Sequence, residues 1–156
     1  MEMDLYLGYS FDFGLSVTVT DYYFGGDWME FGTMHYIEPM LGFEAGSFSI
    51  SAAYMLLAGT EEDVAAGIEE TGLGEEGDMY LEVGYAFDNV SLTLGAGDGQ
   101  YTATDDDPEG DFNICNISIG TSKEVEITEK FSLPISGSVT LNPTTGGFFA
   151  TVGISF

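Results

Sequence analysis

The stretch "MYLEVGYAFDNVSLTLGAG" (79–97) holds two runs with the same alternation on either side of a short polar turn. Apolar residues occupy every second position: Met79, Leu81, Val83, Tyr85 and Phe87, then Val90, Leu92 and Leu94. A period of two predicts a strand with one apolar face. Asp88–Asn89 between the runs predicts a tight turn, so the whole stretch is expected to form a β-hairpin.

The same alternation recurs along the whole chain. It is seen in seven further stretches: 5–12, 15–20, 37–43, 47–54, 117–120, 131–141 and 147–156. No convincing helix is found, although "EEDVAAGIEE" (61–70) is expected to form a turn or two within a loop. The pattern predicts an all-β, antiparallel up-and-down meander of about nine strands, forming one domain over residues 1–156.

Short and long connections alternate. Tight turns are expected near Asp12–Gly14, Ala45–Gly46 and Asp88–Asn89, with a slightly longer turn, "EVEITEK", at 124–130. The other connections are longer: 22–34, 59–78, 98–111 and 142–147. Long, acidic loops at one end and short turns at the other are typical of an outer-membrane barrel.

The two faces also favour a membrane barrel. The second face of the strands is mostly Gly, Ser and Thr, which suits a crowded, wet interior, whereas the apolar face would meet lipid. Aromatic residues gather near both ends of the predicted strands, as in the interfacial girdles of membrane barrels. The alternative is a soluble barrel with these aromatics in its core.

Charge excludes several classes of partner. The chain has 27 acidic residues against Lys123 and Lys130, with a formal net charge of -25. This balance argues against binding to nucleic acid and to anionic lipid. A single cysteine, Cys115, cannot form an internal disulfide.

No targeting segment is recognised. "MEMDLYLGYS" (1–10) lacks a signal peptide's cationic start and apolar core, and no apolar run reaches the ~20 residues of a membrane helix. Three origins stay open: a cytosolic protein, a mature or partial form of an exported one, or a sequence that is not natural.

The last predicted strand, "GFFATVGISF" (147–156), ends on an aromatic residue. Its alternating apolar residues Phe148, Val152, Ile154 and Phe156 resemble the carboxy-terminal signal that the outer-membrane assembly machinery recognises in bacterial barrels. The alternative is a final strand that merely ends apolar.

Several stretches together resemble the TorF-like porins, a family of small bacterial outer-membrane barrels, particularly the Bacteroidetes type. They are "LYLGYSFDFGLSVTVTDYYF" (5–24), "YLEVGYAFDNVSLTLGAGDGQY" (80–101), "FNICNISIGTSKEVEITEKFSLPISGSVTLNP" (112–143) and "FFATVGISF" (148–156). The resemblance implies a porin-like barrel of the outer membrane, with no established substrate and no catalytic residues. It covers only the later two-thirds of a typical member, which begins with a signal peptide and further strands.

The chain departs from that family in two ways. An odd number of strands is unusual for a single-chain barrel, so either amino-terminal strands are missing or the first and last strands pair in parallel. Family members also carry ordinary numbers of lysines, which suggests a halophilic lineage, an environmental fragment or a computationally generated variant here.

Sites for metal ions or catalysis are weakly indicated. Asp105, Asp107 and Glu109 imitate the first half of a calcium loop, but Asn116 stands where the closing Glu is required. A solvated acidic loop is therefore favoured, and no cofactor is expected. His35 could reach Asp27 or Glu30, but a rim histidine is favoured over a catalytic one.

Glu38 and Glu82 are stronger candidates for functional residues, because each lies mid-strand on the small-residue face. A charge within a membrane span is costly unless it faces water or a partner. One interpretation is a structural hydrogen bond to Tyr6, Tyr80 or a serine hydroxyl. The other is a negative pore constriction lined by these two glutamates with Tyr6, Tyr80 and Asp12.

Three functions follow from these predictions. The first is a passive, cation-preferring porin of the bacterial outer membrane, whose partners are the lipid bilayer, the assembly machinery and small cations or solutes. The second is a non-conducting structural or surface-binding membrane barrel. The third is a soluble β-barrel that binds an apolar ligand inside.

Overall fold

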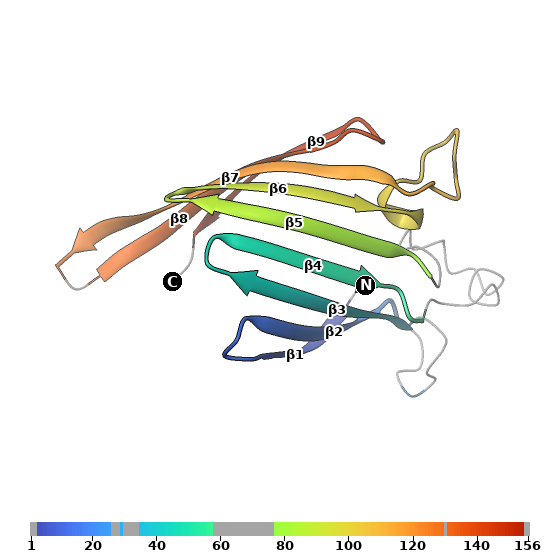
Figure 1. Ribbon diagram of the computed structural model, residues 1–156, viewed down its shortest axis with the longest axis horizontal. Coiled ribbons are helices and arrows are strands. Elements are labelled where there is room, and N and C mark those ends of the chain that lie inside the picture. Colours follow the sequence, from blue (N-terminus) through green and yellow to red (C-terminus); the bar gives the residue numbers. More distant parts are fainter. Residues whose placement is uncertain (1–2, 26–28, 30–34, 58–76, 130, 155–156) are drawn as a thin grey trace.

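A computed structural model describes residues 3–25, 29, 35–57, 77–129 and 131–154. Its elements are β1 (Met3–Ser10), β2 (Leu15–Tyr23), β3 (His35–Ala45), β4 (Phe48–Tyr54), β5 (Met79–Phe87), β6 (Val90–Gly97), the 3₁₀ turn η1 (Gly99–Tyr101), β7 (Asn113–Thr128), β8 (Phe131–Asn142) and β9 (Gly147–Ile154). The nine strands form one antiparallel sheet in chain order (Figure 1). The predicted all-β meander is confirmed.

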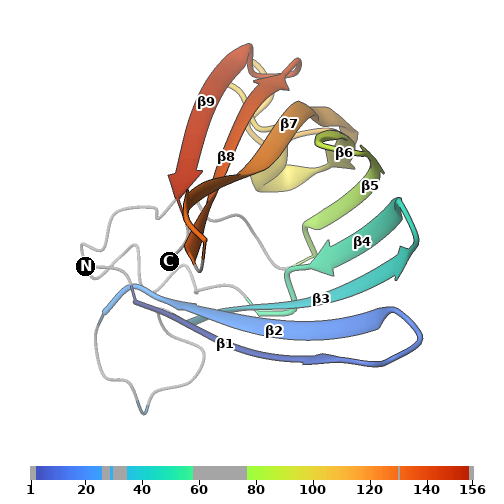
Figure 2. The same ribbon diagram turned by 90° about the vertical axis from the view of Figure 1, so that its left-hand side faces the viewer.

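The sheet is strongly curved but open. Figure 2 shows the strands following one another round a curve, with β1 and β9 at its two ends. The predicted closure into a barrel is not seen among the described residues, since β1 and β9 are not neighbours in the sheet. With nine alternating strands these two run in the same direction, so direct pairing would be parallel and slightly less stable per residue.

The predicted arrangement of the connections, with short turns at one end of the sheet and longer connections at the other, is confirmed. The turns β1–β2, β3–β4, β5–β6 and β7–β8 are short and lie at one end of the sheet, whereas the connections at the other end span 24–34, 55–78, 98–112 and 143–146. Gly14 and Gly46 have φ angles of 98° and 62°, and Asp88 has 45°, which the left-handed backbone of these turns requires. The expected helical turns at 61–70 lie outside the described residues.

The turn predicted at 124–130 is wrong. β7 continues to Thr128, and only Glu129 and position 130 separate it from β8. Val125 and Ile127 alternate with Glu124, Glu126 and Thr128, which continues the period-two pattern of the strand. The β7–β8 hairpin therefore projects beyond its neighbours (Figure 1), because β6 pairs with β7 only as far as Thr121.

One face of the sheet is apolar and exposed on all nine strands. Cross-strand register places apolar residues opposite one another, as in the row Leu81, Ala96 and Ile114. On this face Leu81, Leu94 and Ile119 are 47%, 44% and 51% exposed. Among the described residues the only helix is the three-residue η1, so no second layer of helices covers this face.

Few side chains of the described residues are fully enclosed. The largest that are fully buried are Met55, His35 and Thr102, and all three lie toward the long-loop end of the sheet. No helix in the described part of the chain has the length and apolar character needed to cross a membrane.

Candidate functional site

The Gly, Ser and Thr face lies on the concave side of the sheet. The hydroxyl of Tyr101, in the loop after β6, donates a hydrogen bond of 2.7 Å to Oε2 of Glu38 on β3. β4 and β5 separate those two strands, and three strand spacings amount to ~14 Å along a flat sheet. The two side chains meet because the sheet curves toward this face.

The Glu38 carboxylate is held from two directions. Its Oε2 accepts the bond from Tyr101, and its Oε1 accepts a longer one, 3.4 Å, from the hydroxyl of Tyr22 on β2. The backbone of Tyr101 is held separately, because Nδ2 of Asn142 on β8 donates to its carbonyl oxygen at 3.2 Å. Burial, and then the hydrogen bond to Glu38, raise the pKa of Tyr101 above the ordinary value of 10.0, so the phenol stays protonated.

The Glu82 carboxylate is held in a similar way. Its Oε2 accepts hydrogen bonds from the Tyr80 hydroxyl at 2.6 Å and from Nδ2 of Asn116 at 3.1 Å. The same amide donates to the Tyr80 oxygen at 2.8 Å, so the three groups form a closed set. Ser118 extends it, donating to Oδ1 of Asn116 and sharing a 2.6 Å bond with Thr140.

Two tyrosine rings connect the groups around Glu38 with those around Glu82. The rings of Tyr80 and Tyr101 lie 5.0 Å apart between centroids, at an interplanar angle of 35°. We call the combined set the tyrosine–carboxylate network, and it consists of Tyr22, Glu38, Tyr80, Glu82, Tyr101, Asn116, Ser118 and Thr140. It draws residues from β2, β3, β5, β7, β8 and the β6–β7 loop, and it contains no cationic side chain.

Two glycines of β6 make room for the tyrosines. A Cβ on Gly95 would overlap the Tyr80 hydroxyl and lie 2.7 Å from its Cζ and 3.0 Å from Cβ of Asn116. A Cβ on Gly97 would lie 3.1 Å from Cδ2 of Tyr101 and 2.6 Å from the carbonyl oxygen of Met79. The rings can lie against the backbone of β6 because it carries no side chain at these positions.

The structure brings together some of the predicted site residues. Glu38, Glu82 and Tyr80 belong to the network, and the structural hydrogen bond between Tyr80 and Glu82 is found. Tyr6 on β1 lies on the same face of the sheet as Glu38 but is 79% exposed. The hydrogen bonds to Glu38 that were considered for Tyr6 are donated by Tyr22 and Tyr101 instead. Asp12 lies exposed in the β1–β2 turn, at the other end of the sheet.

Prediction from the sequence missed five members of the network: Tyr22, Tyr101, Asn116, Ser118 and Thr140. Tyr22 follows the period-two pattern of β2 and could have been found by extending that strand by two residues. Asn116 lies at a β-bulge, where Gly95 pairs with Asn116 and Ala96 pairs with Ile114, leaving Cys115 as the extra residue. Tyr101 lies outside any strand and has no periodic signal.

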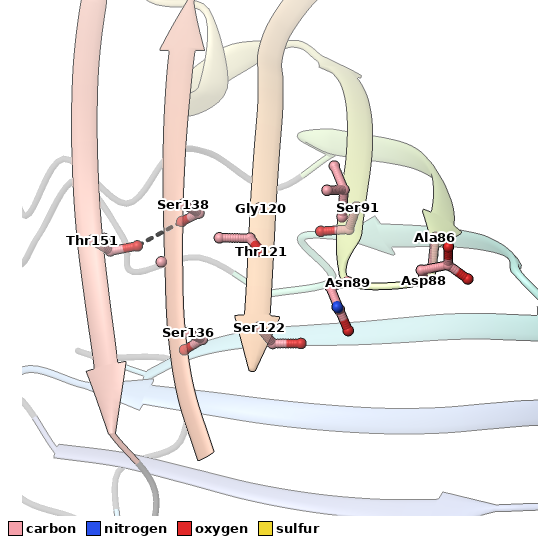
Figure 3. A pocket seen from close by; sticks show the side chains of 12 residues that line it. Ala86, Asp88, Asn89, Ser91, Gly120, Thr121, Ser122, Ser136, Ser138 and Thr151 are labelled. Carbon is pink, nitrogen blue, oxygen red and sulfur yellow. Dashed lines mark hydrogen bonds between the residues drawn. The ribbon is translucent and has the colours of Figure 1, made fainter. Parts of the chain in front are cut away.

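The concave face is hollowed at the short-turn end. One hollow there has a volume of about 260 Å³. Figure 3 shows the side chains that line it, with hydroxyl groups on β6 to β9. Its labelled hydroxyl-bearing residues are Ser91, Thr121, Ser122, Ser136, Ser138 and Thr151, of which Ser138 and Thr151 share a 2.6 Å hydrogen bond. A second hollow of similar volume adjoins it at Ser91, and Glu44 and Asp88 contribute carboxylates to the two.

The acidic loop between β6 and β7 (98–112) is organised by one of its own carboxylates. The Asp107 side chain accepts hydrogen bonds from the backbone N–H groups of Gly110 and Asp111, at 3.3 and 3.0 Å. Within the described residues, no group of three or more His, Cys, Asp or Glu side chains is arranged to hold a metal ion, and the trio Asp105, Asp107 and Glu109 is not gathered.

His35 lies on the opposite, apolar face. Its Nδ1 is 3.0 Å from both carboxylate oxygens of Asp21, and its ring is 4.9 Å from that of Tyr23. It is the first residue of β3, at the long-loop end where it was expected, and its side chain is fully buried. The partners considered for it, Asp27 and Glu30, lie outside the described residues.

The predicted assembly signal lies on β9, at the edge of the sheet. Phe148, Val152 and Ile154 are 67%, 81% and 52% exposed on the apolar face. Phe156 lies outside the described residues.

Comparisons with protein-family models, with curated protein sequences and with solved structures find no match to this chain.

Proposed function

We propose that the chain forms the wall of an outer-membrane β-barrel that lets small hydrophilic solutes pass, with a preference for cations. One observation carries the proposal: the sheet has an exposed apolar face on all nine strands and a hydrogen-bonded polar face on its concave side. A bilayer suits that distribution, because lipid covers the first face and water fills the second.

The lengths of the strands support a membrane location. Most strands contain 7 to 12 residues. A tilted strand of ~9–11 residues spans a bilayer. Hydrocarbon does not tolerate unpaired backbone groups, so the proposal requires the free edges of β1 and β9 to be paired in the membrane.

The charge of the concave face supports cation preference. Glu38 and Glu82 lie on it, Glu44 and Asp88 border its hollows, and the network holds no cationic group. Carboxylates that line a pore favour cations, and acidic loops at its mouth raise the local concentration of cations. The resemblance to the TorF-like porins agrees with this proposal and remains a prediction.

A second candidate, a non-conducting structural barrel, is favoured by one specific observation. The network places tyrosine side chains across the concave face, and small barrels can be filled by such side chains. The soluble barrel with an apolar ligand inside lacks similar support, because the concave side carries the polar residues.

The test is the reversal potential across a planar bilayer under a potassium chloride gradient. We expect a cation preference that is strongest at low salt and is reduced by Glu38→Gln combined with Glu82→Gln. The matched control is Glu124→Gln with Glu126→Gln, which removes as much charge from the exposed β7–β8 hairpin. Anion preference, or equal effects of the two pairs, would remove the constriction role from Glu38 and Glu82. Absence of conductance would favour the non-conducting barrel.

A further inference from the structure

Tyr101 differs from the other members of the network in its attachment. It is the one network residue contributed by a loop, whereas the others belong to strands. Its hydroxyl crosses the concave face to reach Glu38, which is 63 residues away in the chain. We propose that Tyr101 is a latch that closes the loop end of the interior while bound to Glu38, and opens it on release. This inference rests on the proposed passage of solutes.

Three contacts hold Tyr101 in the closed position, each from a different strand. Glu38 on β3 accepts a hydrogen bond from its hydroxyl, Tyr80 on β5 packs against its ring, and Asn142 on β8 donates to its carbonyl oxygen. Only the first of these contacts involves both the side-chain hydroxyl and a charge. It is therefore the contact on which closure of the side chain depends most.

The base of the loop is held independently of the latch. Asp98 Oδ1 accepts a 2.6 Å bond from the backbone N–H of Met79, and Asp78 Oδ2 accepts one of 2.9 Å from that of Gln100. Gly99 closes the loop by donating to the carbonyl oxygen of Gly110 at 2.9 Å. The Tyr101 side chain can therefore swing away while the ladder of the sheet and the base of the loop stay intact.

The experiment records single channels of the full chain and compares the dwell times of the closed and open levels. Tyr101→Phe keeps the ring and removes the bond to Glu38. A hydrogen bond to a charged group corresponds to a factor of about ten or more, so the closed-to-open ratio should fall about tenfold. Tyr85→Phe makes the same chemical change on the apolar face and should leave the ratio unchanged.

Tyr22→Phe distinguishes a loop latch from the mere loss of a hydroxyl at Glu38. It removes the 3.4 Å bond to the same carboxylate but leaves the loop untouched, so its effect should be smaller than that of Tyr101→Phe. Equal effects of the two variants, or no effect of Tyr101→Phe in a conducting protein, would overturn the latch and leave the proposed function standing. If the wild type does not conduct but the Tyr101→Ala variant does, the latch is supported. Silence of every variant would overturn both proposals.

Discussion

Gly95→Ala tests whether the network depends on the bare backbone of β6. The added methyl group would overlap the Tyr80 hydroxyl and approach Cβ of Asn116 to 3.0 Å. Tyr80 then has to move away from β6, and it cannot do so without weakening its 2.6 Å hydrogen bond to Glu82. The substitution therefore acts on the network through packing.

The expected cost combines three terms. Overpacking costs about 1–3 kcal/mol, and the loss of a hydrogen bond to a partly exposed charge costs about 1.5 kcal/mol. Alanine regains about 0.5–1 kcal/mol over glycine within a strand. We expect a net loss of about 3 kcal/mol, within a range of about 1.5–4 kcal/mol, in the free energy of unfolding.

The assay is guanidinium unfolding in detergent micelles, followed by tyrosine fluorescence and circular dichroism. Gly137→Ala on β8 is the matched control, because its Cβ would meet only the carbonyl oxygen of Thr151, at an ordinary 3.6 Å. That control should be neutral or slightly stabilising. A second comparison places Gly95→Ala in a Tyr80→Phe background, where the nearest overlapping atom is gone and the cost should shrink.

Two results would refute the reasoning. One is a Gly95→Ala protein as stable as the Gly137→Ala protein, which would mean that the Tyr80 side chain can move away from the added methyl group without a loss of stability. The other is an unchanged cost in the Tyr80→Phe background, which would place the clash elsewhere.

Three further predictions concern solvent, pH and assembly. The folded chain should require detergent or a bilayer because of its exposed apolar face, and a monomer with native sheet content in plain buffer would contradict this. Because the folded-state pKa of Tyr101 is raised, its contribution to stability is complete below about pH 10 and is lost as the pH rises further. Unfolding free energies above pH 10 should accordingly decline less in Tyr101→Phe than in the wild type, and parallel declines would exclude this residue as the cause. Deleting Phe156 should lower the amount of protein that reaches an outer membrane in cells more than it lowers refolding into detergent, whereas equal losses would indicate stability rather than recognition.

The architecture was largely predictable because period-two patterns determine which face each residue occupies. A slip of one residue would turn the apolar residues of β5 and β6 to the other side, so their pairing is tightly specified. The turns at Gly14, Gly46 and Asp88 were predictable from their turn-forming residues. The end of β7 was not, because Glu124 and Glu126 give its continuation the composition of a loop.

The network was only partly predictable. Glu38 and Glu82 could be recognised as charges within a small-residue face, and Tyr80 as a neighbour of Glu82 on the same face. The pairing of Glu38 with Tyr101 depends on how far the sheet curves, which alternation does not encode. The bulge that orients Asn116 likewise depends on pairing between β6 and β7 rather than on either strand alone.

The chain-order topology has a consequence for the sequence of events in folding. Within the described residues every strand pairs only with its neighbours in the chain, so this sheet can grow hairpin by hairpin with little cost in loop closure. The bond between Tyr101 and Glu38 spans 63 residues and needs β3 to β6 already in place. We therefore expect it to form late in folding and to break early in unfolding. Tyr101→Phe should therefore speed unfolding while leaving the folding rate nearly unchanged, as stopped-flow kinetics in detergent would measure.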